Sequence, residues 1–274
     1  MLNNITALGK FCIHIGGIGD VFYALSSCYD EEEQITFLSY ANDPKIITEL
    51  LGSFKKINRK LVLPNIADYL AMAQTMTHAE YTGHLPPALN YMKWADYHIF
   101  NDFNLTQVSW TDEVSQVKVR DLQVCIQPSG SGKGGHPSKH VCIEPKYWQS
   151  ILNMLREHNI SPCILGTPDD IKNYSVSKEE NYTHLSLWEQ MELIKGSDLM
   201  IGADTWGKNF SLFAKIPTIV WKNNYVGEMA NFDNDPADPI FVHQWEQQGN
   251  LMVIEQEKID TLTRFDKCLK KIFK

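Results

Sequence analysis

Short runs of apolar residues recur along the chain, and most are followed by a stretch in which apolar positions return every three or four residues. The first kind of run predicts a buried strand, and the second predicts an amphipathic helix. In the first half, strands are predicted at 11–15, 34–38 and 61–63 and helices at 21–27, 44–51 and 66–76. In the second half, strands are predicted at 124–126, 162–165, 197–201, 216–221 and 251–254, and helices at 144–158, 186–195 and 210–214.

Both halves begin in the same way, with a strand that runs into a glycine-rich turn. The turn 16–20 follows the first strand, and the loop 127–139, rich in Gly, Ser and Lys, follows the first strand of the second half. Segment 111–121 is polar, has no apolar periodicity and is the predicted interdomain linker. The alternation of strands and helices predicts an α/β protein of two doubly wound, Rossmann-like domains that face each other across a cleft.

We place an N-terminal domain at 1–120, a C-terminal domain at 121–255 and a terminal amphipathic helix in 256–274. The apolar positions of this last helix fall at helical spacing; they are Ile259, Leu262, Phe265, Leu269 and Ile272. The region 77–110 is rich in aromatic residues without clear periodicity. We expect most of these aromatic residues to complete a core, and one or two to line a groove.

The composition narrows the class of protein. A chain of 274 residues with 43% hydrophobic and 21% charged residues is typical of a soluble globular protein with one large or two smaller domains. No apolar run reaches membrane-spanning length, and the segment 1–10 lacks the apolar region of a signal peptide. The scattered cysteines lack CxxC spacing and indicate buried thiols in a reducing compartment. We therefore expect a cytoplasmic protein with no transmembrane segment.

The net charge of −8 argues against nonspecific binding to polyanions, although charge can be unevenly distributed. The most basic run is the segment 55–60, which includes Lys55, Lys56 and Lys60. Such a run is typical of a solvated surface loop. The alternative is a landing patch for an anionic acceptor.

Candidate chemistry lies in the turns that follow predicted strands. Asp20 stands at a helix start, where a carboxylate can act as a general base or simply cap the helix. Lys133 and Lys139 lie in the loop after the strand at 124–126, a position suited to phosphate, although an ordinary surface loop has the same composition. The turn 202–209 joins a strand to a helix, and such turns carry polar groups to the edge where open α/β sheets bind ligands.

Three stretches together resemble the heptosyltransferase family of GT-B glycosyltransferases, which add ADP-heptose to lipopolysaccharide. Segment 16–21, Gly-Gly-Ile-Gly-Asp-Val, is similar to the family's N-terminal GG-x-GD motif. Segment 126–130, followed by Lys139 and Trp148, is similar to the family's donor-domain entry loop. Segment 198–217 resembles the part of the family that binds the nucleotide diphosphate, and the stretches occur in the family's order.

The resemblance implies a GT-B fold and an inverting, metal-independent transfer of a sugar from a nucleoside-diphosphate sugar to an acceptor hydroxyl. Asp20 matches the family's proposed catalytic base, and Lys139 (or Lys133) matches a lysine that contacts the donor phosphates. The chain departs from the family at Trp206 and Asn209, where the family has Gly and His. The nucleotide-sugar is a co-substrate, and no further cofactor or metal is expected.

The expected site residues fall into two groups. The donor-binding group is Gly17, Gly19, Ser129, Ser131, Lys133, Lys139, Gly166, Asp204, Thr205, Trp206, Gly207, Lys208 and Asn209. The acceptor-binding group is His14, His84, Lys55 and Lys56.

Several functions remain open. The acceptor is either a surface glycan, such as lipopolysaccharide or a lipid-linked saccharide, or DNA that carries hydroxymethylated bases, as in some phages. A different activity is that of a sugar-nucleotide epimerase or hydrolase of GT-B architecture. A third class is a noncatalytic nucleotide-sugar binding module, which would bind without turnover.

Overall fold

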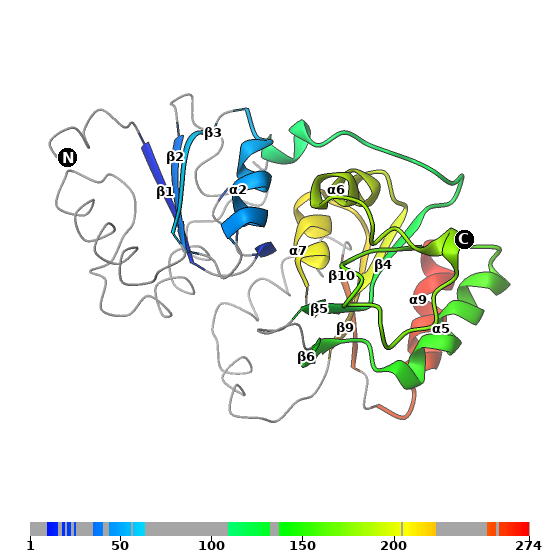
Figure 1. The fold of residues 1–274 in the computed structure, drawn as a ribbon. Helices are drawn as coiled ribbons and strands as arrows, with labels where there is room; N and C mark the ends of the chain where they lie inside the picture. The colour runs from blue at the N-terminus through cyan, green and yellow to red at the C-terminus, as the bar shows by residue number, and fades with distance from the viewer. Residues whose placement is uncertain are drawn as a thin grey trace, which may run out of the picture. The chain divides into compact units, whose positions relative to one another are not determined.

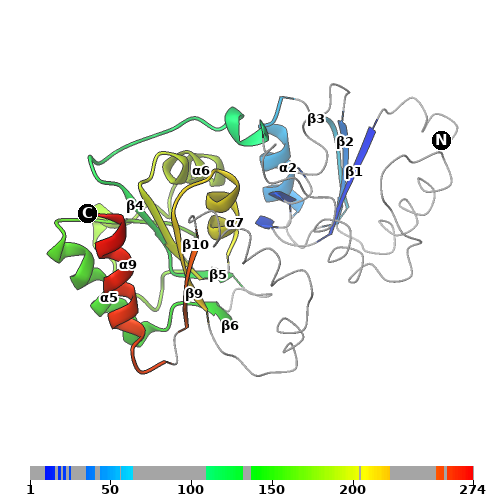
Figure 2. The ribbon, with the colours of Figure 1, turned by 180° about the vertical axis from the view of Figure 1, so that it is seen from behind.

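The computed structural model describes residues 10–15, 18–19, 21–22, 25, 35–40, 44–55, 57–63, 109–131, 137–203, 205–222, 251–255 and 258–273. The chain divides into two compact units, Met1–Glu113 and Val114–Lys274. The division falls inside segment 111–121, for which the sequence predicts a linker. Figure 1 and Figure 2 show the elements of each unit from opposite sides.

The described part of the first unit holds a parallel sheet in the order β1-β2-β3. Its strands are β1 (Lys10–Ile15), β2 (Ile35–Tyr40) and β3 (Ile57–Leu63). The helix α2 (Pro44–Gly52) buries Ile47, Leu50 and Leu51 on one face, as its apolar spacing predicts.

An aromatic cluster lies in the core of the described part of this unit. Trp110 lies in a short 3-10 helix, η3 (Ser109–Glu113), and is fully buried. Its ring stacks on Phe22 with centroids 5.3 Å apart and meets Phe54 edge-on at 5.9 Å. The prediction that aromatic residues of 77–110 complete a core is therefore confirmed for Trp110, and the other aromatic residues of that region lie outside the described residues.

The prediction of a loop at 55–60 is wrong for residues 57–60. Strand β3 already begins at Ile57, whose side chain is buried, so the strand extends four residues before the expected start at 61. Lys55 and Lys60 are exposed. An exposed lysine on a strand keeps its charge in solvent while the backbone pairs with β2, which explains why composition alone suggests a loop.

The described part of the second unit is built on a five-stranded parallel sheet with the order β10-β9-β8-β4-β7. The strands are β4 (Val124–Gln127), β7 (Cys163–Ile164), β8 (Leu199–Gly202), β9 (Thr218–Lys222) and β10 (Leu251–Glu255). The helices are α5 (Pro145–Glu157), α6 (Leu187–Lys195), α7 (Trp206–Phe213) and α9 (Thr261–Ile272), and η4 (Lys178–Glu180) is a short 3-10 helix.

Helices cover both faces of this sheet. Val124 and Ile126 of β4 join a buried cluster with Trp148 of α5 and Phe265 of α9. Figure 1 shows α5 and α9 on one side of the sheet and α6 and α7 on the other. Because successive side chains of a strand point to opposite faces, Gln127 points to the face that α6 and α7 cover.

Three local predictions need correction. The segment 127–139 is not simply a loop, because β5 (Ser129–Ser131) and β6 (Pro137–Cys142) pair antiparallel within it. Helix α7 begins at Trp206 rather than at 210. Ile259 lies before α9 and is fully exposed, so it does not join the apolar face of that helix. Helix α6 starts with a capping box at Ser186, where the backbone N–H of Glu189 donates to the serine hydroxyl at 3.3 Å.

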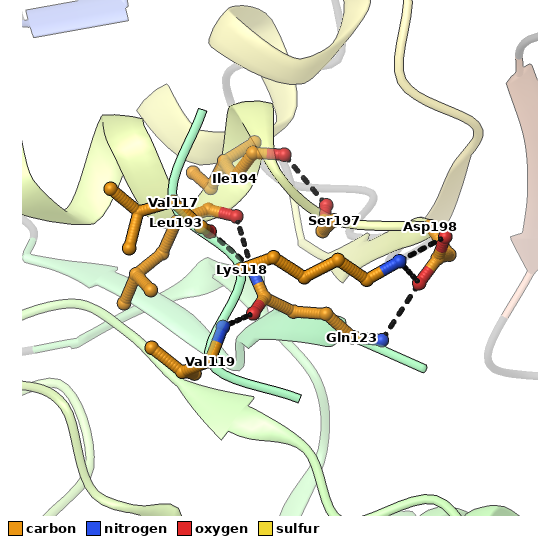
Figure 3. A network of polar contacts seen from close by, with 8 residues as sticks. All are labelled: Val117, Lys118, Val119, Gln123, Leu193, Ile194, Ser197 and Asp198. Carbon is orange, nitrogen blue, oxygen red and sulfur yellow. Dashed lines mark hydrogen bonds and ion pairs between the residues drawn. The ribbon is translucent and has the colours of Figure 1, made fainter. Parts of the chain in front are cut away.

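The segment that follows the division is attached to the second unit by a polar network (Figure 3). The side-chain NH₂ of Gln123 donates to the carbonyls of Val117 at 3.0 Å and Leu193 at 2.7 Å, and its oxygen accepts from the N–H of Val119 at 2.7 Å. Lys118 pairs with Asp198 at 3.0 Å. The second half of the predicted linker is therefore packed structure in this unit. In the part of the chain that the structure describes, no helix has the length and apolar character needed to cross a membrane.

Candidate functional site

The strand order of the second unit marks one place on its sheet for a ligand. Strand β4 comes first in sequence, and the chain continues to β7 on one side of it and to β8 on the other. Where connections leave in opposite directions, the loops separate and a crevice opens beyond the carboxyl ends of the two strands. The last residues of β4 and β8, Gln127 and Gly202, are register partners at this point.

A buried glutamine joins the two sides of this switch point. The side-chain oxygen of Gln127 accepts from the hydroxyl of Thr205 at 2.8 Å and from the backbone N–H of Gly207 at 3.0 Å. Because a backbone N–H can only donate, the oxygen of the amide must face Gly207, and the NH₂ group must point the other way. The contact also requires glycine at 207, since a Cβ there would lie 2.5 Å from the Gln127 oxygen.

The N-terminus of α7 faces this amide. Thr205 is the N-cap residue, and its hydroxyl bonds to Gln127 rather than to the backbone of its own helix. The first turn of α7 carries no acidic side chain. A helix N-terminus presents N–H groups and a partial positive charge, so this end of α7 is suited to an anion.

A second loop at the same sheet edge follows β7. Gly166 adopts φ 112°, a left-handed conformation that side chains disfavour. The amide of Gln190 holds it on both sides, accepting from the Gly166 N–H at 2.8 Å and donating to its carbonyl at 3.0 Å. Gln190 also donates to the carbonyl of Leu185 at 2.9 Å, so its amide is fully used.

Asp170 closes this loop. One oxygen of its carboxylate accepts from the N–H of Thr167 at 2.7 Å and from the Thr167 hydroxyl at 2.9 Å. Burial raises the pKa of Asp170, against the lowering effect of these two bonds. The hydroxyl of Ser129 donates to the Asp170 carbonyl at 2.7 Å, so this predicted donor-binding serine braces the loop.

The predicted site residues fall into three sets. The structure brings Ser129, Gly166 and the stretch 205–209 to the carboxyl edge of one sheet. Trp206, Lys208 and Asn209 are half-buried on α7. Gly19, which is helical, and Lys55, which is exposed, belong to the first unit. The backbones of His14, Ser131 and Lys139 lie in strands, but their side chains are not among the described residues. The remaining predicted residues lie wholly outside the described residues; they are Asp20, Gly17, Lys56, His84, Lys133 and Asp204.

Two residues of this edge escaped prediction, Gln127 and Gln190. Gln127 is the one polar residue of an apolar strand, at its carboxyl end, and that position is a signal that the sequence did offer. Gln190 lies inside an amphipathic helix, where a buried amide cannot be told from an exposed one. Among the described residues, no cluster of three or more His, Cys, Asp or Glu side chains could hold a metal ion.

No family model matches the sequence, and no curated protein matches it. Solved structures do match. Escherichia coli heptosyltransferase WaaC with ADP has 9% sequence identity and a TM-score of 0.59, over 96% of this chain and 98% of that one. The E. coli ADP-heptose lipopolysaccharide heptosyltransferase II has 11% identity and a TM-score of 0.54, over 96% and 98%. The UDP-GlcNAc 2-epimerase from Methanocaldococcus jannaschii has 11% identity and a TM-score of 0.50, over 93% and 91%.

These matches define the class of fold. The protein has a heptosyltransferase-like GT-B fold of the α/β class, as the sequence predicts. At this level of identity the likeness shows the fold alone.

Proposed function

We propose that this protein is a glycosyltransferase that moves a sugar from a nucleoside-diphosphate sugar to an acceptor hydroxyl. The observation that carries the proposal is the heptosyltransferase-like fold, which extends over nearly the whole of this chain and of WaaC. The WaaC structure holds ADP, and heptosyltransferase II is named for an ADP-heptose donor. The switch point in the second unit offers an edge with the right chemistry for such a donor.

In this proposal the donor's diphosphate lies at the N-terminus of α7, beside Thr205 and Gly207. The helix dipole and the N–H groups of the first turn stabilise the negative charge that develops on the departing nucleotide. Lys139, or Lys133, adds positive charge from the β5–β6 hairpin. With these groups holding the phosphates, the transfer requires neither a metal nor a further cofactor.

Asp20 is the proposed general base, and it removes the proton from the acceptor hydroxyl as that oxygen attacks the sugar. Direct attack on the carbon that carries the nucleotide inverts its configuration. His14, His84, Lys55 and Lys56 are proposed on the acceptor side. Two acceptors fit this arrangement, a surface glycan of the lipopolysaccharide type and DNA with hydroxymethylated bases.

A thermal-shift screen of nucleotide-sugars tests the donor. A ligand at 100 times its Kd stabilises the folded state by about 2.7 kcal/mol, which is readily measured. We expect at least one nucleoside-diphosphate sugar to raise the Tm, together with its free nucleoside diphosphate. A panel in which no nucleotide raises the Tm would contradict the proposal.

A second candidate is a sugar-nucleotide epimerase, and the likeness to the UDP-GlcNAc 2-epimerase favours it over other classes. An epimerase converts its nucleotide-sugar without any acceptor. Incubation of the donor alone, followed by chromatography, therefore separates the two activities, because only an epimerase yields an epimer under these conditions.

A further inference from the structure

The described part of the second unit contains three buried glutamines, and they differ in how their NH₂ groups are used. The NH₂ of Gln123 donates to two carbonyls, and so does the NH₂ of Gln190. The NH₂ of Gln127 has no hydrogen-bond partner, although its nitrogen is buried and the side chain is only 1% exposed. Gln127 is thus the exception among these three amides.

The orientation of the Gln127 amide cannot be reversed to remove this exception. A flip would place NH₂ against the N–H of Gly207, so two donors would face each other 3.0 Å apart. A buried donor without a partner is costly, and most such groups in native proteins are paired. The NH₂ group of Gln127 therefore lacks an acceptor, and it belongs to an amide whose oxygen contacts the first turn of α7.

We infer that the NH₂ group of Gln127 binds an anionic oxygen of the ligand's diphosphate, and that Gln127 positions this oxygen against the first turn of α7. The inference rests on the proposed function, since the anion would belong to the nucleotide-sugar. An anionic oxygen matches both features, because it accepts hydrogen bonds and favours the positive end of a helix dipole. The bonds from Thr205 and Gly207 hold the amide in place before the ligand arrives.

The side-chain nitrogen of Gln127 is buried, and this burial sets a condition for ligand binding. A ligand oxygen reaches the NH₂ only when the atoms that cover it shift, so binding includes a local adjustment at this edge. Asp204 directly precedes Thr205 and lies outside the described residues. A carboxylate at this position would be a competing acceptor, and the experiment must separate it from the ligand.

The substitution Gln127→Glu isolates the donated bond. It keeps the oxygen that accepts from Thr205 and Gly207, and it replaces only the NH₂. We expect the Kd for ADP, or for whichever nucleoside diphosphate binds, and the Kd for inorganic pyrophosphate to rise about 10- to 100-fold at pH 8, where an ionised carboxylate would repel the anion.

Gln123→Glu is the matched control at the residue that directly precedes β4, about 13 Å from Gln127 by the rise of an extended chain. Gln123→Glu removes two hydrogen bonds that the NH₂ group donates, whereas Gln127→Glu removes no such bond. We therefore expect Gln123→Glu to lower the Tm more than Gln127→Glu while the Kd values stay within twofold of wild type. Loss of affinity in proportion to loss of Tm in both variants would mean a structural effect, and would overturn the inference.

Nuclear magnetic resonance on the wild-type protein gives a second readout that does not depend on a variant. With ¹⁵N-labelled glutamine, the Gln127 side-chain NH₂ signal should move on addition of ADP or pyrophosphate, while the Gln123 signal stays in place. An unmoved Gln127 signal in a protein that binds ADP overturns this inference and leaves the proposed function standing. A ligand-free Gln127 signal that moves on Asp204→Ala identifies Asp204 as the acceptor and also overturns it. Absence of binding for every nucleoside diphosphate and for pyrophosphate overturns both proposals.

Discussion

The substitution Gly207→Ala tests how the end of β4 is joined to α7. The added methyl carbon would lie 2.5 Å from the Gln127 side-chain oxygen and 2.8 Å from the Cε atom of Met200. Met200 can turn its terminal methyl away, because its side chain is unbranched and flexible. The Gln127 oxygen can withdraw only by giving up its bonds to Thr205 and Gly207.

The expected loss of folding free energy in Gly207→Ala follows from these two hydrogen bonds. Each contributes about 1 kcal/mol net, and leaving the buried donors unpaired costs more. Alanine offsets up to about 1 kcal/mol through its higher helix propensity. We expect the free energy of unfolding to fall by about 1–3 kcal/mol, which lowers the Tm by roughly 2–12 °C for a unit of this size. Nucleotide affinity should fall as well, because the amide of Gln127 moves.

Differential scanning calorimetry measures this loss, and Gly52→Ala is its control. At Gly52 the added methyl would meet the Nζ atom of Lys60, the free end of an exposed side chain that can swing into solvent. The Tm of Gly52→Ala should therefore stay near that of wild type. A Gly207→Ala protein that melts at or above the wild-type temperature with unchanged nucleotide affinity would refute the reasoning.

Three further predictions concern charge. Asp170 has a raised pKa in the folded state, so folding binds a proton, and stability falls as the pH rises from the ordinary carboxyl pKa to the folded one. Over that pH range the Tm of Asp170→Asn should rise relative to the Tm of wild type. A Tm difference that does not change with pH would contradict this prediction. Asp204→Ala and Lys139→Ala should each weaken donor binding in calorimetry, and unchanged affinity in both would remove them from the donor site. Reversing the lysines of segment 55–60 to Glu should impair use of a polyanionic acceptor and flatten its salt dependence without altering donor affinity, whereas unchanged transfer would make them a solvated face.

Much of the fold could be predicted from the sequence because burial imposes a period on the side chains. Strands such as β8 and β10 are almost wholly apolar, and α9 has its apolar residues at helical spacing. The β5–β6 hairpin could not be predicted, since Gly, Ser and Lys composition is the same in a loop and in an exposed ribbon. The start of α7 was missed because Gly207 is a poor helix former that is required there by its contact with Gln127.

The site was predicted less completely, and for a different reason. A motif places a residue type at a turn, as it did for Gly166 and Thr205, but it does not show which polar groups are left unpaired. The contrast between Gln127 and Gln190 is one of hydrogen-bond geometry, and both are simply glutamine in the sequence.

The proposed base has its own test, which separates catalysis from capping at Asp20. Asparagine caps a helix nearly as well as aspartate, so Asp20→Asn should keep the wild-type Tm and the wild-type donor affinity. It cannot take a proton from an acceptor hydroxyl, and turnover should fall by roughly 10²- to 10⁴-fold. Turnover within a few-fold of wild type would make Asp20 a cap and move the search for the base to His14 or His84.

The most direct test of the central claim follows the sugar itself. The nucleotide-sugar that raises the Tm is prepared with a radiolabel in its sugar and incubated with the wild-type protein, offering lipopolysaccharide-type glycan in one reaction and hydroxymethylated DNA in another. We expect the label to become covalently attached to one of these acceptors and free nucleoside diphosphate to appear in equal amount. Label that stays in the nucleotide-sugar, or that appears only in an epimer or in free sugar, would contradict it.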